Sequence, residues 1–242
     1  MPGLRGALDS EASKAAYVRR LFHTIADRYD LITRLLSYGQ DQRWKARLVD
    51  LAAPRPGSRA LDLASGTGDI AFALAARGCR VAALDITHRM LRLAQGKPAA
   101  AGVAFVTGDM MALPLPASTF DLVTTGYGIR NVPRIDAAIA EIRRVLKPGG
   151  MVLSLDFNRP RGAAPRAVYL GYLTIVGSAI GWILHGDPDT YRYIPESIRR
   201  YPGADGVAAL FAQAGFVDCR VIYLLGGLMA INTAVRSPDG SL

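Results

Sequence analysis

The spacing of apolar residues changes at about residue 57, and this change divides the chain into two parts. Before it, apolar residues recur every three or four positions, which is typical of helices that bury one face. The pattern predicts a helix that begins after Ser10, which would cap it, a second stretch over 29–39, and a helix over 41–51 that stops before Pro54 and Pro56. Because no strand pattern occurs there, residues 1–57 are expected to form an N-terminal helical cap.

After Gly57, short apolar runs alternate with helical patterns. Strands are predicted at 60–64, 80–85, 103–107, 121–125 and 151–157, and helices at 69–77, 87–95 and 135–146. A helix over 204–214 and two strands, 216–223 and 228–235, end the chain, and the two strands predict an antiparallel hairpin at one sheet edge. This alternation is typical of a doubly wound, mostly parallel sheet. The sequence therefore predicts an α/β domain over 58–242 with a seven-stranded sheet.

Residues 158–203 interrupt the alternation and predict a helical insertion after the fifth strand. Within them, 167–184 is an uncharged run about as long as the shortest membrane-spanning helix. Three glycines and two polar residues make this run a poor span. The better interpretation is a buried or membrane-dipping helix that covers an apolar pocket.

Composition limits the classes of partner. Half of the 242 residues are hydrophobic, and the formal net charge is +9. Such a charge predicts attraction to nucleic acid, an anionic membrane surface or an anionic ligand, unless the surface is simply solvated. The basic residues are spread out, which argues against nucleic acid. Two isolated cysteines and the absence of a signal-peptide pattern favour a cytoplasmic protein, with no metal site expected.

The candidate chemistry begins at a glycine turn, residues 61–69, between the first strand and its helix. Gly66 and Gly68 have no Cβ, so backbone N–H groups at a helix N-terminus could approach a ligand closely. The turn also fits a dinucleotide pattern, so it does not name the cofactor alone.

Three acidic residues fall where the first three strands end, which is where ligands of such sheets bind: Asp62, Asp85 and Asp109. Asp85 could accept hydrogen bonds from a ribose, or else cap the next helix. Asp109 could accept from an adenine amine, with Ile86 and Met110 as apolar walls, or else be a plain turn residue. An aspartate after the third strand is unusual for a nicotinamide cofactor, so S-adenosylmethionine is the better fit.

Several motifs resemble those of class I methyltransferases, which share a Rossmann-like fold: Asp62-x-Ala-x-Gly66-x-Gly68, Asp85-Ile-Thr-x-x-Met-Leu91, Gly108-Asp-x-x-x-Leu-Pro114 and Arg144-Val-Leu-Lys-Pro-Gly-Gly150. The chain is more narrowly similar to the ubiquinone/menaquinone biosynthesis C-methyltransferases. That resemblance is carried by Arg20-Leu-Phe-x-x-Ile-Ala-x-Arg-Tyr-Asp-Leu31, Gly126-Tyr-Gly-Ile-Arg-Asn-Val132 and Glu196-Ser-Ile-Arg199, and it extends over about 18–235.

The resemblance implies methylation of a ring carbon on a prenylated benzoquinol or naphthoquinol, and both ring types remain open. It implies cofactor contacts from Thr67, Asp85, Asp109 and Met110. Gly126 departs from the family pattern, because some relatives carry there a hydroxyl residue that touches the cofactor.

Carbon methylation needs a ring made electron-rich by loss of a hydroxyl proton, and therefore a base or a cation. Arg130 could hold the phenolate, or else form a structural salt bridge. Asn131 could orient a hydroxyl, and Tyr127 could pack on the ring or hydrogen-bond it. Asp156, which ends the fifth strand, is a candidate base or a turn cap. His185 is a second candidate base, or else a loop histidine.

A prenyl tail would account for both the apolar run and the basic surface, with peripheral contact to an anionic membrane. A homodimer is left open. Three alternatives remain: a related methyltransferase for another hydrophobic small molecule, an NAD-dependent oxidoreductase, and a basic nucleic-acid-binding module. The oxidoreductase lacks an evident Tyr-x-x-x-Lys or His–Asp pair, and the binding module would not need a cofactor turn.

Overall fold

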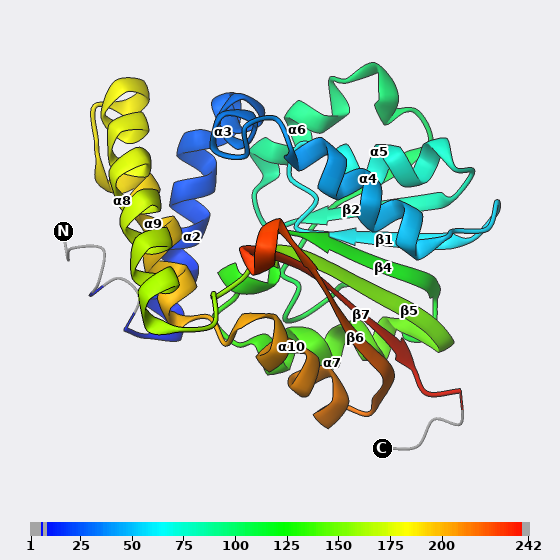
Figure 1. Ribbon diagram of the computed structural model, residues 1–242. Coiled ribbons are helices and arrows are strands. Elements are labelled where there is room, and N and C mark those ends of the chain that lie inside the picture. Colours follow the sequence, from blue (N-terminus) through cyan, green and yellow to red (C-terminus); the bar gives the residue numbers. More distant parts are fainter. Residues whose placement is uncertain (1–5, 7–8, 239–242) are drawn as a thin grey trace.

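The computed structural model describes residue 6 and residues 9–238 (Figure 1). Its helices are α2 Glu11–Ile25, α3 Tyr29–Leu36, α4 Asp41–Ala52, α5 Asp69–Ala76, α6 His88–Gln95, α7 Ile135–Val145, α8 Ala163–His185, α9 Asp189–Arg200 and α10 Gly203–Gln213. Its strands are β1 Arg59–Leu63, β2 Arg80–Asp85, β3 Val103–Thr107, β4 Phe120–Gly126, β5 Leu146–Phe157, β6 Phe216–Leu224 and β7 Met229–Arg236. Short 3₁₀ turns include η3 Ile129–Asn131 and η4 Leu225–Gly227.

The strands form one seven-stranded sheet in the order β3-β2-β1-β4-β5-β7-β6. The ladders from β3 to β5 are parallel, and β7 runs antiparallel to both β5 and β6. The predicted doubly wound, mostly parallel sheet and the terminal hairpin at its edge are therefore confirmed. β1 and β4 are paired neighbours, and the strand order reverses between them, so the connections that leave these two strands lead to opposite sides and leave room for a ligand beyond the carboxyl ends.

Helices cover both faces of the sheet (Figure 1). On one face, Leu48 and Val49 of α4 and Leu74 of α5 pack into a core with Leu153 of β5. On the other face, α7 and α10 bury their apolar sides against β4, β5 and β7. Both faces of the sheet are therefore buried, which explains why the central strands are continuous apolar runs in the sequence.

Helix α2 begins where the sequence predicts. Ser10 accepts from the backbone N–H of Ser13 at 3.1 Å, and the Ser13 hydroxyl accepts from the N–H of Ser10 at 3.2 Å. This reciprocal pair is a capping box, which satisfies two groups that a helix start leaves unpaired. With the N-terminus of α2 fixed, its apolar side faces α3, α6 and α9, and Val18 and Ile25 are buried there.

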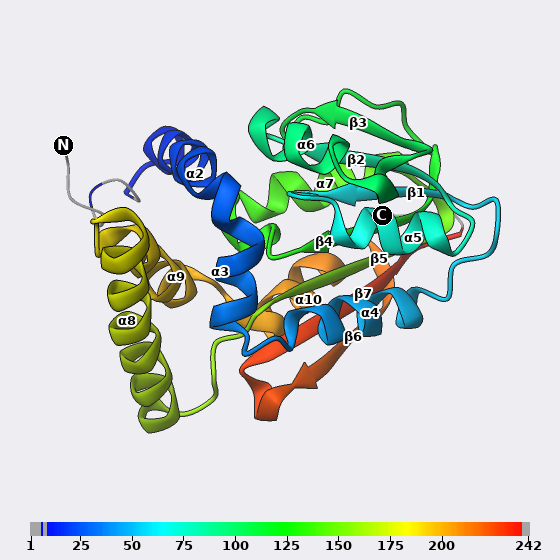
Figure 2. The same ribbon diagram turned by 90° about the horizontal axis from the view of Figure 1, so that it is seen from above.

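The insertion contains two helices, whereas the sequence predicts one. The second, α9, includes Pro195 and many charged residues, which mask its helical pattern. Seen from above, α8 and α9 stand beside α2 and α3 at one end of the molecule (Figure 2). These four helices border the carboxyl edge of the sheet.

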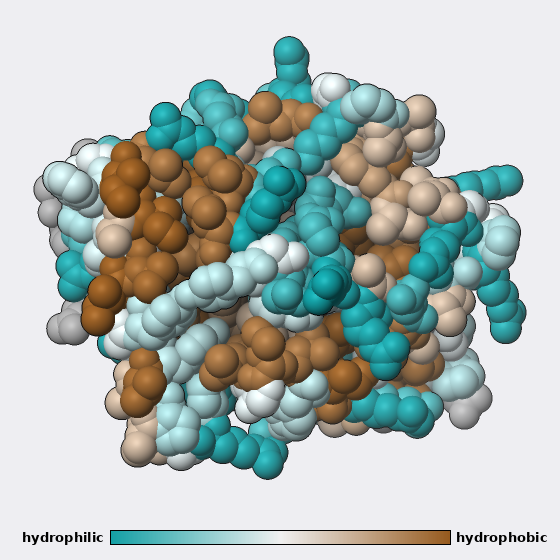
Figure 3. Space-filling view, turned by 45° about the horizontal axis from the view of Figure 1, so that its top comes forward, coloured by the Kyte–Doolittle hydropathy of each residue, from teal (hydrophilic) through white to brown (hydrophobic). Residues whose placement is uncertain are grey.

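The sequence left two forms open for 167–184: the buried helix is wrong, whereas the membrane-dipping helix stays a prediction. Of α8, only Leu170, Leu173, Gly177 and Gly181 are buried, while Ile175 and Trp182 are 73% and 69% exposed. Brown residues gather on this side of the molecule (Figure 3). Among the described residues, α8 is the one helix long and apolar enough to cross a membrane by length and composition. Its inner face nevertheless covers an apolar cavity, as the second half of the prediction expects.

Candidate active site

The glycine turn after β1 is a left-handed loop. Ala64, Gly66 and Gly68 have φ of 51°, 54° and 92°, and the last two are the conformations that glycine adopts without strain. A Cβ on Gly68 would lie 2.5 Å from the ring of Phe72, so this glycine is needed for the packing of α5. Gly66 instead lines a cavity, so the two predicted glycines serve different purposes.

That cavity, here called the turn cavity, lies at the carboxyl ends of β1, β2, β3 and β4. Six predicted cofactor residues line it: Gly66, Asp85, Ile86, Asp109, Met110 and Gly126. Residues of α2 close its other side, among them Ala15, Val18 and Phe22. The topology thus brings together side chains from three successive strand ends, as the sequence predicts.

Asp85 bridges the glycine turn and the end of β2. One carboxylate oxygen accepts from the N–H of Gly66 at 2.9 Å, and the other from the N–H of Thr87 at 2.7 Å. Burial raises the pKa of Asp85, while these two bonds lower it. Thr87 occupies the N-cap position of α6, but its hydroxyl makes no capping bond there. Asp85 therefore orders the turn and still faces the cavity.

Asp109 forms part of its own turn and also lines the cavity. Its Oδ1 accepts from the N–H of Met111 at 2.8 Å, which is the turn role that the sequence left open. Met110 is buried beside it, and its methyl group would lie 3.2 Å from a Cβ on Gly128. This packing makes Met110 an apolar wall of the cavity.

Several buried polar atoms around the turn have no hydrogen-bond partner among the described residues: Asp62 Oδ2, Ser65 Oγ, Thr87 Oγ1 and Thr125 Oγ1. Unpaired buried polar atoms are rare in native proteins, and a group of them beside a cavity fits a polar ligand. Asp62 also accepts from Thr124 at 2.8 Å, and burial raises the pKa of its carboxyl to about 7.

Asp62 and Thr67 line a smaller recess beside the turn rather than the turn cavity itself. The Thr67 hydroxyl donates to Asp30 of α3 at 2.5 Å, so it is turned toward the N-terminal helices. Gly126 lines both spaces. A Cβ there would lie 2.7 Å from the Cδ1 of Ile70, so in this chain Ile70 fills the volume that a larger residue at 126 would need.

A second cavity, here called the helical cavity, lies between the sheet edge and the four bordering helices. Apolar and aromatic residues line most of it, among them Leu21, Ile25, Ile32, Leu36, Trp44, Phe157, Tyr169, Leu173, Tyr191 and Ile194. Four residues line both cavities: Phe22, Tyr29, Tyr127 and Asn131. The two spaces thus share a wall.

Tyr127 forms part of that shared wall in a strained conformation. Its φ is 60°, which is uncommon for a residue with a Cβ, and its N–H donates to Leu155 at 2.7 Å. Its ring lies 5.6 Å from that of Phe157. The hydroxyl is buried without a partner among the described residues, and burial raises its pKa well above the usual value. A ligand in the helical cavity could supply the missing partner.

Arg130 lines the helical cavity and forms a buried ion pair with Asp156. Its Nε donates to Asp156 Oδ1 at 3.1 Å, and its backbone N–H donates to the other oxygen at 3.2 Å. Its Nη1 donates to Ser197, and the guanidinium lies 5.3 Å from the ring of Phe157. The salt bridge that the sequence left as an alternative is therefore present. Among the described residues, Nη2 has no hydrogen-bond partner.

Asp156 is 3% exposed and is not among the described residues that line either cavity. As placed here it cannot reach a substrate directly, which argues against a base. His185 is likewise absent from both linings. It ends α8, and its Nε2 lies 2.9 Å from the Tyr191 hydroxyl. The prediction of a base at the pocket mouth does not fit that position.

Asn131 is held at both ends of its amide. Its Nδ2 donates to the carbonyl of Tyr127 at 2.7 Å, and its Oδ1 accepts from Tyr193 of α9 at 2.9 Å. From the other side, Lys14 of α2 donates to the carbonyl of Val132 at 2.6 Å. The segment after β4 is therefore fixed by helices from both ends of the chain.

Sequence reasoning missed the buried cluster around Lys45 of α4. Its Nζ lies 2.8 Å from Asp69 and 3.0 Å from Asp41, and 6.0 Å from the centre of the Tyr127 ring. Asp41 and Lys45 are one helical turn apart, which is a signal for a pair, but Asp69 joins them only because α4 packs on α5. This cluster closes the recess that Asp62 and Thr67 line.

Residues 10–236 match the ubiE/COQ5 methyltransferase family. A demethylmenaquinone methyltransferase of Thermus thermophilus is 41% identical over 220 residues, which cover 89% of this chain and 100% of that protein. A ubiquinone/menaquinone biosynthesis C-methyltransferase of Paracoccus denitrificans is 40% identical over 230 residues, which cover 93% of this chain and 92% of that protein.

Solved structures share the fold at low sequence identity. An S-adenosylmethionine-dependent methyltransferase of Thermotoga maritima has a TM-score of 0.65 at 17% identity, covering 91% of this chain and 100% of that one. A second structure is phosphoethanolamine N-methyltransferase 2 of Haemonchus contortus in complex with phosphomonomethylethanolamine and S-adenosylhomocysteine. It has a TM-score of 0.60 at 18% identity, and the match covers 81% of this chain and 52% of that one. The fold predicted from the sequence is the one found in these methyltransferases.

Proposed function

Because the chain belongs to the ubiE/COQ5 methyltransferase family, we propose that it methylates a ring carbon of a prenylated quinol with S-adenosylmethionine as the methyl donor. The observation that carries this proposal is the wall shared by the turn cavity and the helical cavity. Two sites that meet at Tyr127 and Asn131 allow a donor methyl group on one side to face a ring carbon on the other.

The turn cavity suits the adenosine part of the cofactor. Asp85 would accept hydrogen bonds from a ribose and Asp109 from an adenine amine, with Ile86 and Met110 as apolar walls, which is supported by the position of all four in the lining of this cavity. The recess with Asp62 and Thr67 adjoins it beyond Gly66 and would take the amino-acid end. When bound, the cofactor supplies an electrophilic methyl group on a sulfonium.

The helical cavity suits the quinol. Its aromatic and aliphatic walls exclude water and match a prenyl tail, and Arg130 is the permanent cation among its lining residues. The free Nη2 of Arg130 can donate to a quinol oxygen, which lowers the pKa of that hydroxyl and enriches the ring in electrons. Asp156 then serves to orient Arg130. Alignment of ring and donor supplies much of the rate, since the transfer is a direct displacement.

We also propose peripheral membrane contact, because a substrate with a prenyl tail would account for this contact as well as for the apolar cavity. Exposed apolar residues lie on two of the four helices that border it: Leu31 and Leu35 of α3, and Val168, Ile175, Trp182 and Ile183 of α8. A net charge of +9 favours anionic lipid, with about 1 kcal/mol for each cation near the surface. A cytoplasmic protein that visits the inner membrane face fits these features. A homodimer stays a prediction that sedimentation can test.

The test is the quinone profile of a strain from which the gene is deleted. We expect one demethylated quinone to accumulate, and the wild-type gene to restore the profile. The identity of that quinone assigns benzoquinol or naphthoquinol. An unchanged profile would instead favour another hydrophobic acceptor. Titration of the purified protein with S-adenosylmethionine and with NADH separates the methyltransferase from an oxidoreductase, which would bind NADH alone.

A further inference from the structure

One segment that resembles the family, Glu196–Arg199, has no role in the chemistry described above. It lies in the second half of α9, a helix that the sequence does not predict. The buried side of α9 faces the η3 turn, which contains Arg130 and Asn131. Tyr193 and Ser197 are 2% and 5% exposed on that side, and they are spaced by one helical turn.

Each of these two residues contacts one of two consecutive residues of η3. The Tyr193 hydroxyl donates to Asn131 Oδ1 at 2.9 Å. The Ser197 hydroxyl accepts from Arg130 Nη1 and donates to the carbonyl of Ile194 at 2.8 Å. Two consecutive residues of η3 are therefore hydrogen-bonded to two residues of α9 that are four positions apart. These two bonds fix the position of α9 relative to η3.

We infer that Tyr193 and Ser197 are positioning residues for the methyl transfer, through which α9 sets the orientation of Asn131 and Arg130. This inference rests on the proposed function and goes beyond it, because neither residue touches a reacting atom. Asn131 lines both cavities, and its amide can be turned either way unless a partner specifies the ends. The carbonyl of Tyr127 can only accept, so it takes Nδ2. Oδ1 is then left to accept from the Tyr193 hydroxyl, whose bond holds the amide in that orientation.

The surroundings of Tyr193 keep its hydroxyl protonated, so that it can donate a hydrogen bond. Burial raises the pKa of its hydroxyl, so the phenol stays protonated across the working pH range. Its ring packs 5.6 Å from that of Tyr17 of α2, which adds a contact to the opposite helix. Loss of the hydroxyl would leave Asn131 Oδ1 buried without its donor, and the amide would then turn or draw in water.

The same bonds connect substrate binding to the catalytic turn. Tyr193 and its neighbour Ile194 also line the helical cavity, so a quinol that packs against α9 fixes the helix that holds Asn131 and Arg130. A correctly seated tail would thereby align the turn. Because a positioning effect appears in the rate of transfer more than in binding, kcat is the expected readout.

The experiment compares Tyr193→Phe with Tyr17→Phe in the full-length enzyme, using S-adenosylmethionine and a short-tailed demethylated quinol. Tyr17→Phe is the matched control, since Tyr17 belongs to the same ring pair but its hydroxyl has no hydrogen-bond partner among the described residues. We expect Tyr193→Phe to lower kcat about tenfold, with the dissociation constant for S-adenosylmethionine within twofold of wild type. Tyr17→Phe should keep the wild-type kcat.

A double-mutant cycle with Asn131→Ala separates positioning from general stability. If Tyr193 acts through Asn131, Tyr193→Phe lowers kcat no further in the Asn131→Ala background. Equal effects of Tyr193→Phe in both backgrounds, or a wild-type kcat for Tyr193→Phe, would overturn the inference. Ser197→Ala provides a second variant, with the same expected loss of kcat. If the wild type methylates no quinol, the proposed function falls, whereas the same cycle in unfolding free energy still tests the contact between Tyr193 and Asn131.

Discussion

Arg130 and Asp156 form an ion pair that is almost completely buried, with 3.1 Å between Nε and Oδ1. Only 4% and 3% of their side chains are exposed. A buried charge that loses its partner is strongly destabilising, because burial removes the water that would otherwise solvate it. The pair therefore holds Arg130 at the helical cavity in one orientation. It also makes the stability of the enzyme sensitive to either residue.

We predict that Asp156→Ala lowers the free energy of unfolding by about 3–5 kcal/mol. The control is Asp136→Ala, which removes the exposed partner of Arg134, where both side chains are more than half exposed. This control substitution should lower the free energy of unfolding by less than about 1 kcal/mol. Urea denaturation measures both. Equal losses for the two variants would show that the buried pair is not the feature that matters.

Gly128→Ala is predicted to disturb the turn cavity. A Cβ at 128 would lie 2.3 Å from the hydroxyl oxygen of Thr125 and 2.8 Å from the Cβ of Ala64, so the turn must shift. We expect at least a tenfold weaker affinity for S-adenosylmethionine, about 1.4 kcal/mol, by calorimetry. The control is Gly171→Ala in α8, where no atom lies within 4 Å of the new Cβ. Unchanged affinity in Gly128→Ala would mean that the turn adapts.

Asp62 gives a prediction about pH. Its pKa is raised to about 7 by burial, so the folded protein binds a proton that the unfolded chain releases near pH 4. Unfolding then releases that proton, and the stabilisation is lost as pH rises through about 7. As pH rises from about 4 to about 7, the unfolding free energy of wild type should fall relative to that of Asp62→Asn. A difference between the two proteins that stays constant over this range would contradict the raised pKa of Asp62. Chemical denaturation across this range measures the difference.

The exposed apolar side of α8 predicts membrane contact. Ile175→Glu and Trp182→Glu together should reduce co-flotation with anionic liposomes severalfold and slow the methylation of a long-tailed quinol. Turnover of a short-tailed quinol should stay near wild type, because neither residue lines the helical cavity. The control is Val217→Glu, an exposed apolar residue of β6. Flotation that ignores lipid charge and both substitutions would remove the membrane proposal.

What the sequence predicts well here is local. The glycine turn, the strand ends at Asp85 and Asp109 and the start of α2 each follow from residues close together in the chain. Strand and helix periodicity then place these residues at one sheet edge without knowledge of any distant contact. Arg130 and Asn131 could likewise be placed near the site.

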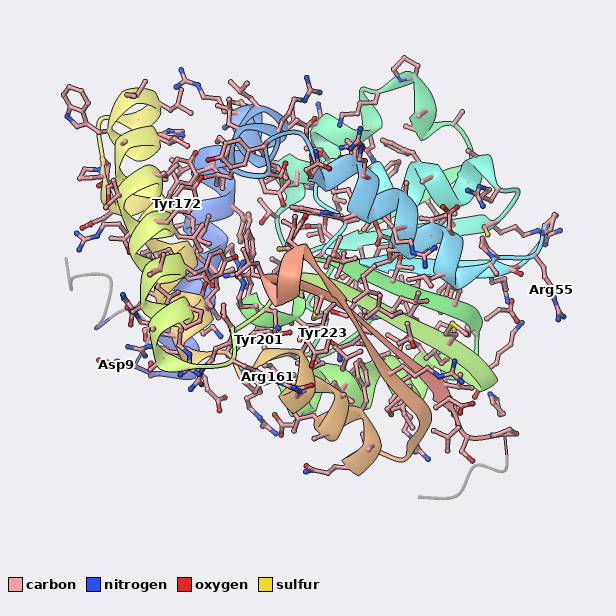
Figure 4. The ribbon with its side chains drawn as sticks, viewed as in Figure 1. Asp9, Arg55, Arg161, Tyr172, Tyr201 and Tyr223 are labelled. Carbon is pink, nitrogen blue, oxygen red and sulfur yellow. The ribbon has the colours of Figure 1, made fainter. Side chains whose placement is uncertain are left out.

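The partners of those residues could not be predicted, because they come from far along the chain. Asn131 is expected to orient a substrate hydroxyl, but the hydroxyl it contacts belongs to Tyr193, 62 residues away in sequence. Pro195 hides the helix that presents it. In α8, an apolar run with small residues is consistent both with burial and with exposure, and only the packing against α9 shows which positions face inward. Figure 4 shows Tyr172, whose hydroxyl contacts that of Tyr38, among these α8 side chains.

The measurement that tests the central claim most directly is methyl transfer by the purified enzyme. A demethylated, short-tailed quinol kept reduced is incubated with S-adenosylmethionine labelled with carbon-13 in its methyl group, and the product is analysed by mass spectrometry and carbon NMR. We predict one labelled methyl group on a ring carbon. Label on a quinol oxygen, or no transfer by an enzyme that binds S-adenosylmethionine, would contradict the account.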